Sequence, residues 1–175
     1  VGCNLFKLKP DSSGIATEEV YANKSMMNHH GGVILLGKHI YGHSDSGGWT
    51  CLELATGEVV WKNGGVGKGA IAYADGHFYC RSEASKGTIG LIEATPEGYR
   101  EKGRFDQPDR SGKNSWAHPV IAGGKLYLRV HDGARPAEPK AGESTLTRIE
   151  QTLQALENSA IAKAKLKVEG IPGVV

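Results

Sequence analysis

Histidine is the residue type in this chain best suited to chemistry. His29 and His30 precede a strand-like apolar run, His118 precedes a later one, and His43 lies two residues before Asp45. Imidazole and carboxylate groups bind transition metals when three or four of them converge. No HxH or HExxH spacing accompanies them, so we predict no metal and interpret these five residues as weak candidates for a ligand site.

The alternative interpretation is that the same histidines are polar residues of loops and strand ends that form hydrogen bonds to backbone groups. The cysteines indicate no chemistry of their own, because Cys3, Cys51 and Cys80 lack the CxxC spacing of zinc and redox sites. We expect them to be buried free thiols, and a disulfide between Cys51 and Cys80 stays open.

The elements that must position these residues repeat along the chain. A shift of 38 residues places Gly31 on Gly69 and Tyr41 on Tyr79, and a further shift of 48 places Tyr79 on Tyr127. Short apolar runs alternate with turn signals such as Asp75-Gly76. Four short strands in about 40 residues are typical of one blade of a β-propeller. We expect strands at 3–9, 20–23, 33–36, 39–43, 49–54, 59–61, 71–74, 77–81, 88–93, 99–105, 120–122 and 125–129.

This pattern predicts an all-β domain over residues 1–133, a partial β-propeller of about three four-stranded blades. The opening residues resemble the second half of a unit. Residues 134–143 are rich in proline and predict a linker. Residues 144–175 predict a short helical tail of unknown role, because apolar residues recur there at helical spacing. That stripe consists of Leu146, Ile149, Leu153, Leu156 and Ala160.

The repeat motifs resemble those of PQQ-binding-like β-propeller proteins, the BamB-like and quinoprotein alcohol dehydrogenase-like superfamily. They are the runs GKHIY at 37–41, LELATGEVVW at 52–61, YADGHFYC at 73–80, LIEATPEG at 91–98 and WAHPVIAGGKLYLR at 116–129. The resemblance implies that Trp61 packs into a neighbouring blade. It also implies six to eight blades, of which this chain would be a C-terminal part, and a bacterial, periplasmic or secreted location. The residues assigned to blade structure are Tyr41, Tyr79, Tyr127, Trp49, Trp61, Gly57 and Gly76.

The function expected from the resemblance is a non-catalytic binding or scaffold module, whose loops contact a protein or a small ligand. These loops are 44–48, 82–87 and 105–115. The alternative is a fragment of a PQQ-dependent dehydrogenase, which would bind PQQ with calcium. Such enzymes carry a vicinal Cys-Cys pair that this sequence lacks, so we predict no cofactor.

Charge and hydropathy bear on the possible partners. The net charge is +2 with no basic stripe, which argues against nucleic acid. No apolar run approaches the ~18 residues of a transmembrane helix, and no signal peptide opens the sequence.

Overall fold

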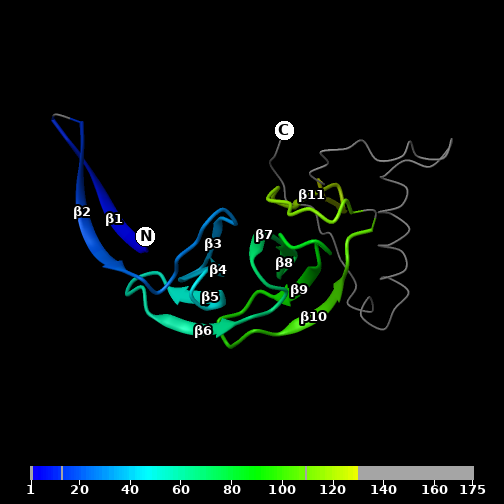
Figure 1. Ribbon diagram of the computed structural model, residues 1–175. Helices are drawn as coiled ribbons and strands as arrows, with labels where there is room; N and C mark the ends of the chain where they lie inside the picture. Colours follow the sequence, from blue (N-terminus) through cyan, green and yellow to red (C-terminus); the bar gives the residue numbers. More distant parts are fainter. Residues whose placement is uncertain (1, 13, 109, 130–175) are drawn as a thin grey trace.

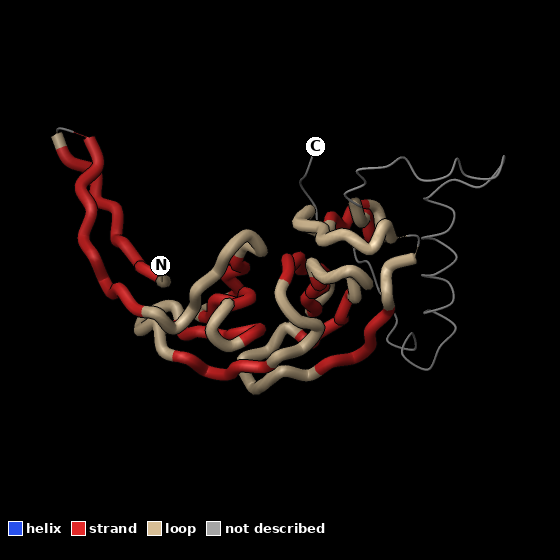
Figure 2. The backbone as a smooth tube through the Cα atoms, viewed as in Figure 1, coloured by secondary structure: helices blue, strands red, loops and turns tan. Residues whose placement is uncertain are grey.

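The computed structural model describes residues 2–12, 14–108 and 110–129, and every regular element in these ranges is a β-strand (Figure 1, Figure 2). The prediction of an all-β chain is therefore confirmed for this part. The predicted linker at 134–143 and the predicted helical tail at 144–175 lie outside the described residues. Within the described residues, no helix has the length and apolar character needed to cross a membrane.

The chain begins with a long hairpin that projects from the rest of the molecule (Figure 1). Its strands are β1 (Cys3–Asp11) and β2 (Gly14–Asn23), paired antiparallel with a bulge near Leu5. β2 starts earlier than predicted, because the pairing of Pro10 with Ile15 extends the ladder into the expected turn. Proline is tolerated there because β1 is an edge strand.

The first four-stranded sheet follows, with its strands in sequence order and each neighbouring pair antiparallel. It consists of β3 (Val33–Leu36), β4 (His39–Ser44), β5 (Gly48–Glu53) and β6 (Val59–Asn63). Gly57 in the last turn has a φ of 70°, and a Cβ there would lie 2.7 Å from Cε2 of Tyr21. Its lack of a side chain therefore lets the end of the hairpin pack against this turn.

The second four-stranded sheet repeats this order. It consists of β7 (Gly69–Ala74), β8 (His77–Ser82), β9 (Ile89–Glu93) and β10 (Glu101–Phe105). The predicted hairpin turn at Asp75 and Gly76 is present, with φ values of 48° and 73°. Positive φ at both central positions is the geometry that an Asp-Gly hairpin favours.

The third unit is shorter than expected in the part of the chain that the structure describes. It contributes β11 (Val120–Ala122) and β12 (Lys125–Tyr127), which pair only with each other there. Of the about three four-stranded blades expected, the described residues show two complete four-stranded sheets and two sheets of two strands each.

An apolar core joins the two four-stranded sheets face to face. The rings of Tyr41 and Phe78 lie 4.5 Å apart across it. Trp61 reaches the second sheet, where its Nε1 donates a hydrogen bond to the carbonyl of Thr95 at 3.2 Å, and its ring meets Tyr99 edge-on. The remaining core residues are Trp49, Cys51, Val66, Ile71, Cys80 and Ile92.

All three cysteines are free thiols in the structure, and the possible bridge between Cys51 and Cys80 is not formed. Both of these residues are buried. Burial raises the pKa of the Cys51 thiol to about 11 and that of Cys80 well above its ordinary value. Since the thiolate is the nucleophile, these two residues act as small core side chains.

The meander order gives the stacked sheets two unlike ends. Tight turns, such as those at Gly37 and Gly76, lie at one end. The β4–β5 and β8–β9 loops lie at the other end, together with the connections at 24–32, 64–68 and 106–119. Four of the five candidate site residues, the exception being His43 on β4, lie in these loops and connections.

Candidate functional site

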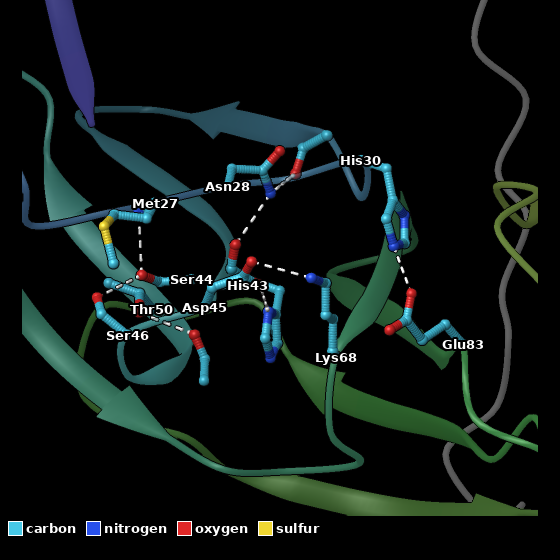
Figure 3. Close-up of polar contacts among 12 residues, drawn as sticks. Met27, Asn28, His30, His43, Ser44, Asp45, Ser46, Thr50, Lys68 and Glu83 are labelled. Carbon is cyan, nitrogen blue, oxygen red and sulfur yellow. Dashed lines mark hydrogen bonds and ion pairs between the residues drawn. The ribbon is translucent and has the colours of Figure 1, made fainter. Parts of the chain in front are cut away.

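The candidate site is a polar surface at the long-loop end of the two sheets (Figure 3). It is formed by the segment before β3, the end of β4, the residue preceding β7 and the residues after β8. Figure 3 shows His30 and Glu83 on one side, and His43, Asp45 and Lys68 on the other. These residues form two groups, the first around His30 and the second around Asp45.

The first group is centred on His30. Its Nε2 lies 2.5 Å from Oε2 of Glu83, and both side chains are about four-fifths buried. His118, aligned with this region by the repeat, donates from Nε2 to the carbonyl oxygen of His30 at 2.8 Å. The ring of His29 lies 5.1 Å from that of His30. Three of the five predicted residues are therefore neighbours, and His118 bonds to backbone, as the structural interpretation of the histidines expects.

The second group links β4 to the connection before β7. Nζ of Lys68 lies 2.9 Å from Oδ2 of Asp45, while Nδ1 of His43 lies 3.9 Å from Oδ1 of the same carboxylate. The hydrogen bond from Lys68 lowers the pKa of Asp45, so the carboxylate is ionised at neutral pH. The second group therefore consists of a salt bridge between Lys68 and Asp45, with the imidazole of His43 beside it.

The two groups do not combine into a metal site. The residues that the structure describes contain no set of three or more His, Cys, Asp or Glu side chains placed to hold a metal ion. A small cavity in this part of the chain lies in the apolar core between Tyr41, Trp49 and Phe78, away from the polar surface.

His43 is a buried imidazole whose ring meets Trp49 edge-on at 5.3 Å. Its backbone carbonyl accepts a hydrogen bond from the Asn28 side-chain amide at 2.9 Å, which ties β4 to the segment before β3. Burial lowers the pKa of His43 below 6.5, and the opposing effect of Asp45 does not cancel it. The folded protein therefore holds this imidazole neutral near neutral pH.

A pH-dependent loss of stability follows from this shift. Because the folded-state pKa of His43 lies below its unfolded value, the unfolded chain binds more protons between the two values. The contribution of neutral His43 to the free energy of unfolding is complete above about pH 6.5 and falls as the pH drops below that value. We expect His43→Gln to flatten the slope of unfolding free energy against pH in this window, as measured by urea unfolding. His29→Gln, at an exposed position, is the control, and an equal slope in both variants would contradict the prediction.

Sequence reasoning missed Lys68 and Glu83. A signal for Glu83 was available, because the shift of 38 residues that aligns the sheets also places Asp45 on Glu83. Each carboxylate comes directly after the second strand of its sheet. Lys68 carries no such signal, since only the folded chain brings it to Asp45.

The long loops are bonded to one another through backbone groups. The amide of Glu83 donates to the carbonyl of Lys68 at 2.7 Å, and its own carbonyl accepts from the amide of Ser115 at 3.0 Å. The guanidinium of Arg110 donates to the carbonyls of Ala84 and Ser85 at 2.8 and 2.9 Å. The β8–β9 loop and the β10–β11 connection are therefore held in one arrangement, which favours binding with little ordering cost.

Arg81 is a third residue that the sequence did not point to. Its side chain is 1% exposed, and it donates to the carbonyls of Ala117 and Arg129 and to Oε1 of Gln107, at 2.7 to 2.8 Å. Desolvation lowers its pKa to about 10, so it remains charged at neutral pH. All three acceptors follow β10 in the chain, and Arg81 therefore fastens the third unit to the second sheet.

Comparison with protein-family models finds no matching family, and comparison with curated proteins finds no match. The functional interpretation therefore depends on the repeat, the packing of the sheets and the contacts of the loop surface.

Proposed function

We propose that this chain is a non-catalytic binding or scaffold module, a partial β-propeller of the PQQ-like repeat superfamily. The supporting observation is that the 38-residue offset maps one four-stranded meander onto the next, and that the two stack face to face. Trp61 reaches from the first sheet to the second, as the resemblance implies for a residue at a blade end. We extend the proposal to a periplasmic or secreted location.

The binding surface in this proposal is the long-loop end. It presents exposed His29, the ion pair of Asp45 with Lys68, and Trp116, whose side chain is more than half exposed. Exposed aromatic residues among charges of both signs are typical of protein-binding surfaces, and tryptophan contributes large binding energies. The proposal therefore favours a protein over a small ligand, since the cavity described above lies in the apolar core and not at this surface.

Exposed residues at the two ends allow a direct test of this surface. A loop variant, His29→Ala with Trp116→Ala, and a control variant, Lys38→Ala with Glu58→Ala at the tight-turn end, are immobilised beside the native protein. An extract of bacterial periplasm is passed over all three. We expect a set of proteins that the native and control forms retain and the loop variant does not. Equal retention by the loop variant would contradict the proposed surface.

The dehydrogenase alternative predicts a different result. A quinoprotein would retain the quinone absorbance after mixing with PQQ and calcium and desalting, and would then reduce a dye when given an alcohol. We expect neither, because the chain lacks the vicinal cysteine pair of these enzymes. Retained absorbance together with dye reduction would replace the binding-module proposal.

A further inference from the structure

The sequence contains a single Asn-Gly pair, formed by Asn63 and Gly64. The two residues lie where β6 ends and the connection to β7 begins, and both are exposed. The pairing of β6 with β5 ends at Asn63, which lies opposite Trp49. Gly64 is therefore beyond the strand ladder, at a point where water reaches both the backbone and the Asn63 side chain.

The side-chain carbonyl group of Asn63 accepts a hydrogen bond from the backbone. The amide of Gly65 donates to Oδ1 of Asn63 at 2.8 Å, which is the arrangement of an Asx-turn. A donor at this oxygen stabilises the negative charge that develops there when a nucleophile attacks Cγ. The hydrogen bond therefore favours reaction at the side-chain carbonyl carbon of Asn63.

The nearest nucleophile in the chain is the backbone nitrogen of Gly64, the following residue. A Cβ at Gly64 would meet no atom within 4 Å, so the described residues leave this position open. Glycine has no side chain to hinder the approach of its nitrogen to Cγ, and its backbone adopts the widest range of conformations. Among the described residues, the amide of Gly64 donates to no carbonyl outside the strand ladder.

We propose that Asn63 is a site of spontaneous deamidation in the folded protein. The nitrogen of Gly64 gives its proton to hydroxide and bonds to Cγ of Asn63. The side-chain nitrogen then takes a proton from water and leaves as ammonia, and the product is a cyclic succinimide. Water opens the succinimide at Cγ to give aspartate, or at the backbone carbonyl carbon to give isoaspartate. Water is the only reactant consumed in the whole sequence.

The isoaspartate product lengthens the main chain by one carbon atom between Asn63 and Gly64. Gly65 leaves little room for this change, because a Cβ there would lie 2.5 Å from Cδ1 of Trp49. The added length therefore displaces the connection toward Lys68, whose ion pair with Asp45 belongs to the proposed binding surface. This effect on binding depends on the proposed function, whereas the deamidation itself does not.

Incubation of the full chain at mildly alkaline pH, followed by peptide mapping with mass spectrometry, tests the proposal. We expect aspartate and isoaspartate at position 63 as separate chromatographic peaks, with ammonia released in equal amount. Asn28 is the internal control, because its side-chain amide donates to the carbonyls of Gly32 and His43. It should stay intact over the same time. Folded protein in which Asn63 is unmodified, or reacts no faster than Asn28, would overturn the proposal.

Gly64→Ala tests the assigned nucleophile, because its methyl group hinders the approach of the nitrogen while the fold has space for it. We expect deamidation about ten-fold slower or more, and an equal rate would overturn the assignment.

Asn63→Asp reproduces the aspartate product without lengthening the main chain. Amide hydrogen exchange at residues 64–68 should therefore be faster in the purified isoaspartate form than in Asn63→Asp. Equal exchange in the two forms would refute the displacement of the connection and leave the deamidation established by mapping.

Discussion

Gly69→Ala is expected to lower the free energy of unfolding by about 3 kcal/mol or more, near the upper end for overpacked sites. Gly69 opens β7, and a Cβ at this position would lie 1.7 Å from the carbonyl oxygen of Arg81 on the neighbouring strand. Backbone atoms cannot move aside as a flexible side chain can. The added methyl group must therefore separate β7 from β8, the strands at the centre of the stack.

Gly64→Ala is the matched control for this prediction. Gly64 lies a few residues before β7, in the connection between the two sheets, but a Cβ there meets no atom within 4 Å, and its φ is outside the left-handed region. We expect its unfolding free energy to stay within about 0.5 kcal/mol of the wild type. Chemical denaturation of the three proteins measures both values, and similar stabilities for the two variants would refute the proposed close approach at Gly69.

Arg81→Met is expected to destabilise the protein by about 3 kcal/mol or more, because it leaves several buried oxygen acceptors without a donor. Methionine roughly keeps the length of the side chain but cannot bond to Gln107, Ala117 or Arg129. Arg81→Lys keeps the charge but not the planar guanidinium that serves these separate acceptors, so we expect an intermediate loss. The order of stability should be wild type, lysine variant, methionine variant.

The control for Arg81 is Arg104→Met, which removes an arginine bonded to Glu101 on a half-exposed surface. Exposed ion pairs contribute about 1 kcal/mol or less, so a small effect is expected there. Amide hydrogen exchange adds a local measurement, because loss of Arg81 should reduce protection in β11 and β12 more than in β4 and β5. Uniform loss of protection would show that Arg81 does not fasten the third unit.

Much of the secondary structure was predictable because it depends on local signals. Asp75-Gly76 and Gly37-Lys38 predicted hairpin turns, and the apolar runs between such signals became strands close to their expected positions. The start of β2 was missed because cross-strand pairing at Pro10 and Ile15 outweighed the turn-forming residues beside them. Cooperative pairing of a ladder is not visible in a short window of sequence.

The candidate site was predictable only in part. The sequence placed His29 and His30 before one strand and His118 before a later one, and the structure brings the three residues together. Glu83, the partner of His30, lies 53 residues from it in the chain, a separation that only the packing of the sheets closes.

The sequence by itself determined the order of strands and turns, and which residues recur at equivalent positions, because hairpin turns and strand alternation depend on residues close together in the chain. The tertiary structure decided what each equivalent position does. Tyr41 and Tyr127 align in the repeat, yet one is buried and the other is exposed, because among the described residues only Tyr41 has a following four-stranded sheet packed against it. The tertiary structure also decided the role of Arg81, which is buried and links separate segments. The acceptors of its guanidinium come from parts of the chain that only folding brings together.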